Sequence, residues 1–222
     1  MPANLKIIQL RELLAARGLA TAGVARETFV VGWPALDFAA GEGLPKGGIT
    51  ELHCLQHGGA LAVAQLLRAA HRRREFLVLV DGADTFDLAG VEPAVLTRLL
   101  WVRCRSAVEA VRAADLLLRD GNLPLVLLNV RGCGDVARVP SQAWYRLQRI
   151  VEQSGVTLLV LTPRPLVPSA RVRVILRHRF TLADLDRDLE ELAAGTTFET
   201  VRMQGARAAG FSEDEPQLAE AG

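Results

Sequence analysis

The chain has 222 residues, of which 50% are hydrophobic, and its 26 lysines and arginines nearly balance 25 aspartates and glutamates, giving a formal net charge of +1. This length fits one large domain, or one domain with tails, and the apolar residues suffice for a substantial core. A near-neutral charge excludes a global attraction to nucleic acid or to membrane surfaces, so any such affinity must come from a local patch.

The chain contains three widely spaced cysteines without a CxxC pair, namely Cys54, Cys104 and Cys133. This odd, scattered set is typical of reduced thiols in a cytosolic protein and not of a disulfide framework or a zinc site. The amino terminus lacks the basic region and the apolar run of a signal peptide. Since no apolar stretch approaches the roughly 20 residues that span a bilayer, we expect a cytoplasmic protein that does not associate with membranes.

The first part of the chain predicts a helix, a turn-rich segment, and then a strand followed by a helix. Residues 5–17 carry apolar side chains at helical spacing, which favours a short helix. Residues 28–31 predict a short strand, and the frequent glycines and prolines of 32–48 favour turns. Residues 49–54 predict a strand, and 59–73 predict a helix with one apolar side.

Apolar segments further along predict the strands of a sheet, at 76–80, 100–104, 123–130 and 156–161. Those at 76–80, 123–130 and 156–161 are continuous apolar runs, which suit parallel strands that are covered on both faces. A more exposed strand is expected at 172–176, where arginines flank and interrupt the apolar residues.

Helices are predicted between these strands. Ser106 is expected to cap a helix over 106–119, with Glu109 three residues later completing a capping box. Ser141 is expected to cap a second helix, over 141–154. Shorter helical segments are predicted at 93–99 and 182–192.

Strands that alternate with helices of about 10 to 15 residues predict right-handed βαβ units. The predicted fold is therefore α/β, with a mostly parallel sheet that helices cover on both faces. From residue 195 onward the polar sequence loses its periodicity and includes an acidic run, which favours a flexible tail. We divide the chain into an amino-terminal helix and linker, a core domain and this acidic tail, at 1–27, 28–192 and 193–222.

The segment after the strand at 49–54 occupies the place of a phosphate-binding loop but departs from its pattern. In G-x-x-x-x-G-K-[ST], glycines expose backbone N–H groups to phosphate, lysine neutralises the phosphates, and the hydroxyl holds magnesium. Here Cys54 stands at the first glycine, Gly59 at the second, Ala60 at the lysine and Leu61 at the hydroxyl. We therefore expect no nucleotide cofactor and no metal in the degenerate loop formed by Cys54, His57, Gly58, Gly59, Ala60 and Leu61.

Two other positions that would handle nucleotide are altered as well. The buried strand at 123–130 reaches neutral Asn129 where an acidic residue should hold magnesium through water. Asp81 and Asp84 follow the strand at 76–80, but no glutamate does. Either aspartate could substitute for that catalytic acid, although we favour Asp81 as a capping or turn residue at its strand end. These losses predict a pseudo-ATPase without catalytic residues.

The segment from Gly32 to Glu51 resembles the entry to the RecA recombinase core. The residues that carry this likeness are Leu36-Asp37, Gly43-Leu44-Pro45, Gly47 and Glu51-Leu52. Within the RecA-like superfamily the chain is most similar to the ImuA group, sometimes labelled SulA-like. That second likeness lies in the Leu-Trp-Val-Arg segment of 99–103 and the alanine-rich helix of 107–119, and the resemblance covers roughly residues 28–180.

The ImuA resemblance implies a RecA-like fold and a role in the SOS response to DNA damage. Members of this group support error-prone translesion synthesis with ImuB, a catalytically inactive relative of Y-family polymerases, and with a DnaE-type polymerase. The resemblance thus implies an ImuB-like partner, with RecA as a further candidate, and it leaves direct DNA binding open. ATP dependence is not implied, because the chain departs from the RecA pattern at Cys54, Ala60, Leu61 and Asn129.

Two alternatives to a non-catalytic accessory protein stay open at this point. One is a weak ATPase of DNA repair or recombination, or an ATPase completed by a cation from a partner subunit. The other is a regulator that docks on RecA by subunit mimicry through the segment before Gly32.

Two basic clusters and one tryptophan are candidate contacts for a partner or DNA. Arg72, Arg73 and Arg74 lie at a predicted helix carboxyl end, where cations also complement the helix dipole. The second cluster could instead be the guarded, solvated edge of a sheet, and it comprises Arg171, Arg173 and Arg177. Trp33, beside a proline in the turn-rich segment, is a candidate interface anchor.

Overall fold

The computed structural model describes residues 27–54, 58–89, 91–178 and 181–204. These residues belong to one structural unit. The predicted helix at 5–17 and the acidic stretch beyond residue 204 lie outside the described residues, as do residues 55–57 of the degenerate loop.

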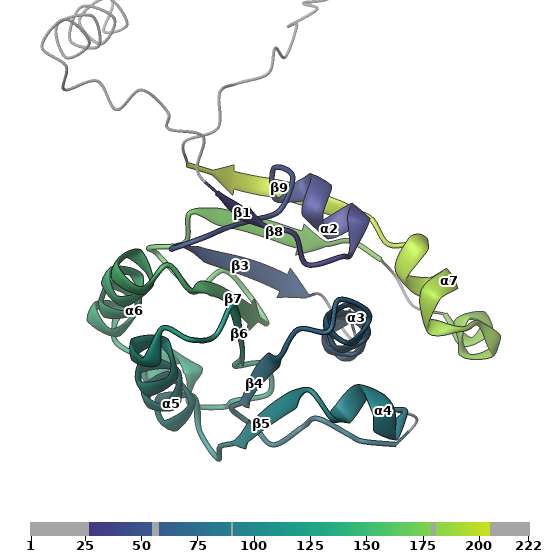
Figure 1. Ribbon diagram of the computed structural model, residues 1–222, viewed down its shortest axis with the longest axis horizontal. Coiled ribbons are helices and arrows are strands. Elements are labelled where there is room, and N and C mark those ends of the chain that lie inside the picture. The colour runs from purple at the N-terminus through teal and green to yellow at the C-terminus, as the bar shows by residue number, and fades with distance from the viewer. Residues whose placement is uncertain (1–26, 55–57, 90, 179–180, 205–222) are drawn as a thin grey trace, which may run out of the picture. The chain divides into compact units, whose positions relative to one another are not determined.

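Seven strands form the main sheet, in the order β5-β4-β6-β7-β3-β8-β9 (Figure 1). All neighbours pair in parallel except β9, which runs antiparallel to β8 at one edge. This confirms the predicted α/β class with a mostly parallel sheet. The strands are β3 Ile49–Cys54, β4 Leu77–Asp81, β5 Leu99–Arg103, β6 Leu125–Asn129, β7 Thr157–Thr162, β8 Val172–Leu176 and β9 Phe198–Met203.

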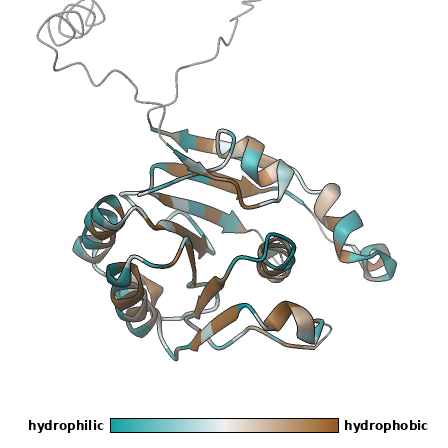
Figure 2. Cartoon of the chain, in the orientation of Figure 1, coloured by the Kyte–Doolittle hydropathy of each residue, from teal (hydrophilic) through white to brown (hydrophobic). Residues whose placement is uncertain are grey.

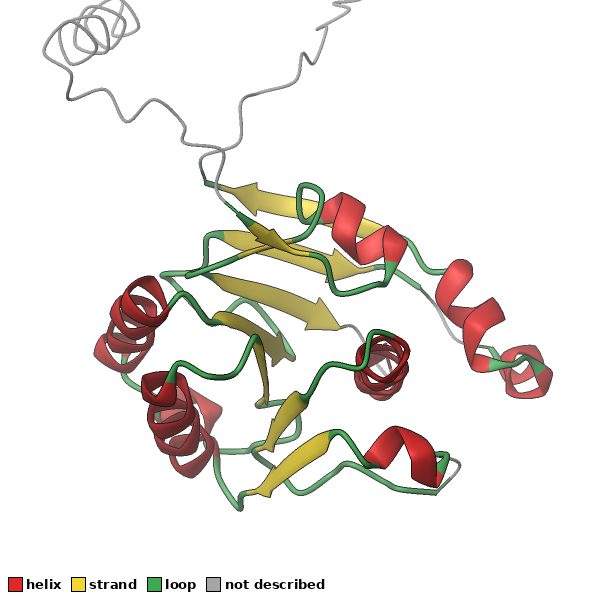
Figure 3. Cartoon of the chain, in the orientation of Figure 1, coloured by secondary structure: helices red, strands yellow, loops and turns green. Residues whose placement is uncertain are grey.

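Helices cover both faces of the sheet, as predicted (Figure 3). One face carries α5 and α6 side by side, and α3 lies on the other, where α7 packs against it (Figure 1). A separate antiparallel pair joins β1 (Thr28–Phe29) to β2 (Leu44–Pro45). The helices are α2 Pro34–Ala39, α3 Gly58–Arg72, α4 Pro93–Leu96, α5 Ala107–Asp120, α6 Ser141–Ser154 and α7 Leu189–Ala194, with short 3₁₀ turns η1 Val136–Arg138 and η2 Leu182–Asp186.

The core consists of two apolar clusters, one on each face of the sheet. Figure 2 shows that the inner strands are mostly hydrophobic. Side chains alternate along a strand, so the buried strands contribute to both clusters. In β4, for example, Leu77 and Leu79 join the cluster beneath α3, whereas Val78 and Val80 join the cluster beneath α5 and α6. This double coverage explains the continuous apolar runs at the starts of β4 and β6.

The caps of α5 and α6 differ from each other. Ser106 Oγ accepts a hydrogen bond from Glu109 N (3.1 Å), as predicted, whereas the Glu109 carboxylate accepts from Arg105 N (2.9 Å), one residue before the expected partner. The predicted Ser141 cap is wrong. Pro140 occupies the cap position with extended backbone, and Ser141 is already the first helical residue of α6.

The core domain extends further than predicted, because β9 lies within the segment that was expected to be tail. Its six residues, Phe198–Met203, pair with β8 and complete the sheet. An edge strand can be solvated along much of its length, and β9 has no fully buried residue. It therefore lacks the apolar run that identifies the inner strands. The turn-rich segment likewise contains α2 and β2, which the sequence did not indicate.

Candidate functional site

The candidate site lies at the carboxyl ends of β3, β4 and β6, beside the start of α3. β3 ends at Cys54, which is buried, and α3 begins at Gly58. Asp81 and Asn129 are register partners at the ends of β4 and β6. The fold thus brings the degenerate loop and the altered acidic position to the same end of the sheet. His57 lies outside the described residues.

Arg131 provides a positive charge beside the start of α3. A Cβ atom on Gly59 would overlap the Arg131 guanidinium, so the absence of a side chain at Gly59 leaves the space that this group occupies. Burial raises the pKa of the Cys54 thiol to about 12, and the charge of Arg131 opposes that rise. Cys54 is therefore a neutral, buried thiol at physiological pH.

Asp81 is fully buried and holds the turn that follows β4. Its carboxylate accepts hydrogen bonds from Phe86 N (2.7 Å), Thr85 Oγ1 (3.4 Å) and Asn129 Nδ2 (3.4 Å). The Asn129 side-chain oxygen in turn accepts from Arg131 N (3.2 Å). These contacts confirm the predicted turn role of Asp81. Asn129 has a structural role, because its side-chain NH₂ donates to Asp81 and its side-chain oxygen accepts from Arg131 N.

Asp84, the other candidate acid, forms a two-point ion pair with Arg103. Arg103 Nε and Nη2 lie 2.6 and 2.7 Å from the two carboxylate oxygens. These hydrogen bonds lower the pKa of Asp84, and Asp84 raises the pKa of Arg103 in return. A carboxylate held ionised in this way is a poor proton acceptor for activating water.

A cavity of about 650 Å³ opens beside these residues, between α3, the segment after β4, and α7. Its polar side chains come from Arg68, Thr85, Asp87, Asn129 and Arg131, and its other walls are apolar. The start of α3 supplies Ala60 and Leu61, which offer neither a cation nor a hydroxyl. Among the described residues no group of three or more His, Cys, Asp or Glu side chains could hold a metal ion. The cavity can accept an anionic or apolar group through its arginines and its apolar walls.

The predicted contact role of Arg173 is wrong, because Arg173 forms a buried ion pair inside the sheet. Its Nε lies 2.6 Å from Oε2 of the fully buried Glu51, and its side chain is 17% exposed. The other oxygen of Glu51 accepts from Thr162 Oγ1 (3.1 Å), Leu166 N (2.6 Å) and Val167 N (3.2 Å). The interpretation of this region as a sheet edge is also wrong, since β8 lies between β3 and β9.

Apart from Arg74, the remaining predicted arginines form ion pairs on the surface or at its margin. Arg171 is largely buried and pairs with Glu152 on α6, which makes it unsuitable as a contact. The others are more exposed and stay candidates for a contact. Arg177 pairs with Glu199, and Arg72 pairs with Glu190. Arg73 binds the Glu75 carboxylate and the Val30 carbonyl, and its guanidinium lies over the Phe29 ring. Arg74 is exposed in the turn after α3.

Trp33 is part of the core, which corrects its prediction as an interface anchor. It is 1% exposed, its indole N–H donates to the Ala193 carbonyl (3.2 Å), and its ring meets Phe198 edge-on at 5.0 Å. Trp33 therefore joins α2 to α7 and β9. Both partners are distant in sequence, so the turn-rich surroundings of Trp33 gave no indication of them.

Arg131 is a site residue that the sequence did not single out. It stands two residues after Asn129, just beyond the end of a buried strand. In parallel sheets such positions border ligand sites, which was the available signal.

No protein-family model matches the chain, and the search of curated proteins found no match in sequence. Within the described residues, no helix is long and apolar enough to cross a membrane. The fold and the geometry of this site are therefore the basis for assigning a function.

Proposed function

We propose that the chain is a non-catalytic RecA-like accessory protein of the SOS DNA-damage response. In this role it supports error-prone translesion DNA synthesis by binding an ImuB-like partner, and RecA and a DnaE-type polymerase are further candidate partners. The observation that supports a non-catalytic role is the start of α3. Ala60 and Leu61 stand where a phosphate site needs a cation and a hydroxyl, and the Arg131 guanidinium lies over Gly59.

The surrounding acids also favour a non-catalytic role. Asp81 is bound by the backbone of its own turn, Asp84 is bound by Arg103, and the position paired with Asp81 is a neutral amide, Asn129. Both candidate acids and the Asn129 amide thus have structural partners. The resemblance of 99–103 and 107–119 to ImuA supports the choice of pathway.

A second candidate function is a weak or partner-completed ATPase. Arg131 supports it, because this residue places a cation near the amino end of α3, where a phosphate group would bind. The cavity of about 650 Å³ also lies within the roughly 300–1,000 Å³ typical of ligand sites. A partner would then have to supply the magnesium ligand and the catalytic acid.

Two measurements on the full-length protein separate these functions. Co-expression with an ImuB-like protein should yield a complex that survives purification without nucleotide, and loss of that complex would remove the main support for the accessory role. The midpoint temperature of thermal unfolding should be the same with magnesium and ATP as with magnesium alone. Ligand at 100 times its dissociation constant would stabilise the fold by about 2.7 kcal/mol, so a clear ATP-dependent shift, or ATP hydrolysis by the complex, would favour the ATPase.

A further inference from the structure

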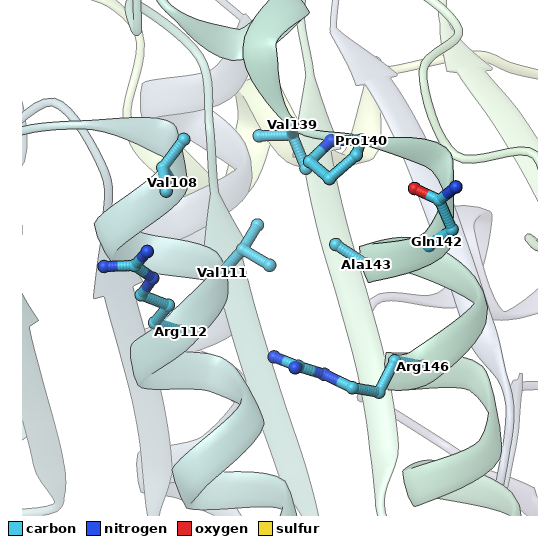
Figure 4. Close-up of a pocket in the computed structure, with 8 residues that line it drawn as sticks. All are labelled: Val108, Val111, Arg112, Val139, Pro140, Gln142, Ala143 and Arg146. Atoms are coloured by element: carbon cyan, nitrogen blue, oxygen red, sulfur yellow. The ribbon is translucent and has the colours of Figure 1, made fainter.

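A second hollow lies between α5 and α6, on the opposite face of the sheet from α3. It measures about 310 Å³ and is lined by Val108, Val111, Arg112, Val139, Pro140, Gln142, Ala143 and Arg146 (Figure 4). We call it the α5–α6 groove. All of its lining residues belong to these two helices or to the two residues before α6, so it is separate from the candidate site.

The groove exists because small and β-branched side chains face each other between the helices. Val111 on α5 and Ala143 on α6 point toward the space between them, with Val139 above (Figure 4). Val111 and Val139 are buried, so they form an apolar floor. Leu116 on α5 (71% exposed) and Tyr145 on α6 (53% exposed) are exposed side chains of the same two helices, and neither lines the groove. The groove itself is an apolar hollow at the surface, which is typical of protein contact sites.

Arginines give the groove an excess of positive charge. Figure 4 shows Arg146 reaching from α6 toward α5 below the apolar floor, with Arg112 at the α5 rim. Arg146 and Arg119 share Asp115, at 3.4 and 3.3 Å. Arg112 is exposed and has no ion-pair partner within the described part of the chain. The charges of Arg112, Arg119, Arg146 and Asp115 thus sum to an excess of two positive charges in and beside the groove.

The backbone at the upper end of the groove adds to this field. Both helices follow parallel strands, so both begin at the same end of the sheet. The start of α5 is already satisfied, since Ser106 caps it and Asp135 accepts from Ala107 N (2.9 Å). The start of α6 follows Pro140 and has no side-chain cap. The uncapped N–H groups of α6 attract negative charge, in the same sense as the arginines.

We propose that the α5–α6 groove binds a short acidic segment of a protein partner, which inserts an apolar side chain between Val111 and Ala143 and places carboxylates against Arg112 and Arg146. The volume suits one or two side chains of a peptide. The positive excess selects acidic over basic segments. This inference rests on the proposed role in protein contacts, but it concerns where and how one partner binds.

The test uses the full-length protein and a displayed library of random 12-residue peptides as the probe. Peptides that the wild type enriches should combine an apolar residue with acidic residues one to four positions away. Arg112→Glu should weaken the selected peptides about tenfold or more, which corresponds to about 1.4 kcal/mol. Ala143→Leu, which fills the groove with an apolar group, should weaken them independently of charge. Fluorescence anisotropy with labelled peptides measures both effects.

Arg149→Glu is the matched control, because Arg149 is also an exposed arginine of α6 but does not line the groove. It should leave peptide affinity within about twofold of wild type, and all three variants should keep the wild-type unfolding temperature. Enrichment of no peptide, enrichment of peptides without acidic residues, or equal affinity for wild type and Arg112→Glu would each overturn the proposal. If the groove variants still bind an ImuB-like partner fully, the groove is not its docking site although the accessory role stands. If the wild type binds no such partner, the accessory role itself fails.

Discussion

Glu51 on β3 and Asp81 on β4 are both fully buried carboxylates of the same sheet, but their partners differ in kind. Glu51 faces a guanidinium, that of Arg173, and also accepts from a hydroxyl and two backbone N–H groups. Asp81 forms no ion pair with any described residue, and its partners are a backbone N–H, a hydroxyl and the Asn129 amide. The Glu51 carboxylate thus joins β3 to β8 by an ion pair and to β7 by the Thr162 hydroxyl, whereas the Asp81 carboxylate holds a local turn by hydrogen bonds to neutral donors.

The comparison shows that a buried Asp or Glu on a strand of this sheet does not by itself indicate a catalytic residue. Glu51 belongs to a closed ion pair that leaves no oxygen for a ligand. Asp81 lies where a nucleotide-handling acid would lie, but the turn of 82–86 surrounds it with donors. The four predictions that follow test this contrast, and each concerns the stability of the fold.

Glu51→Ala should have the largest effect. It leaves Arg173 without its charge partner inside the sheet, and breaking a buried pair in this way costs about 3–5 kcal/mol. Urea unfolding at pH 7 measures the loss. Glu51→Gln should cost less because its amide keeps an acceptor, and Glu199→Ala, which breaks the exposed Arg177 pair, should cost less than about 1 kcal/mol. A Glu51→Ala loss as small as the Glu199→Ala loss would contradict the contrast.

Asn129→Asp should destabilise the fold at neutral pH by about 2–4 kcal/mol, because it places two carboxylates side by side at low effective dielectric. Asn129 Nδ2 now lies 3.4 Å from Asp81 Oδ1. The loss should shrink as the pH falls, since protonation of either acid removes the repulsion. Adding Asp81→Asn should recover most of the stability. Equal losses in the single and double variants would show that repulsion is not the cause.

Asp81→Ala should cost about 1–3 kcal/mol, the typical penalty for leaving buried donors without an acceptor. The donors concerned are Phe86 N and the Asn129 amide. Amide hydrogen exchange should show faster exchange at Phe86, while amides of β8 remain protected. An unchanged exchange rate at Phe86 would refute the turn role of Asp81.

The Asp84–Arg103 pair should have the smallest effect, because it is exposed and screened by salt. Asn is the suitable replacement for Asp84, since φ is +52° there and Asn tolerates that conformation. The folded-state pKa of Asp84 is lowered, so its contribution is present above the unfolded-state pKa and is lost as the pH falls through the folded-state value. Melting curves of Asp84→Asn and wild type should therefore converge at low pH and in 1 M salt. A difference that persists in both conditions would contradict this account.

The sequence predicted the inner architecture well, because strands buried on both faces are rich in apolar residues, as β4 is at Leu77–Val80. The predicted strands at 49–54 and 172–176 and the helix at 141–154 have the observed bounds. It failed at β9, where much of the strand is solvated and its polar residues resemble a tail. It also failed at the start of α6, since cap geometry depends on the backbone of Pro140 as well as on residue type.

The sequence predicted those features of the candidate site that depend on the residue type at a fixed position of the phosphate-binding pattern. The departures at Ala60, Leu61 and Asn129 follow from the sequence, and the structure places Asn129 in register with Asp81 near the start of α3. The partners of Arg173 and Trp33 were not predictable, because they lie more than a hundred residues away in the chain. Only folding shows that one arginine neutralises a core glutamate and that one tryptophan fills the core.

By itself the sequence determined the order of strands and helices, the missing cation and hydroxyl after β3, and the neutral residue at the end of β6. These properties are local, since each depends on a side chain and its neighbours along the chain. The tertiary structure decided which charges are available to a partner. It buried Arg173 against Glu51, placed Arg131 over Gly59, and left Arg112 exposed beside an apolar hollow. Exposure and pairing depend on segments that are distant in sequence, and packing alone brings those segments together.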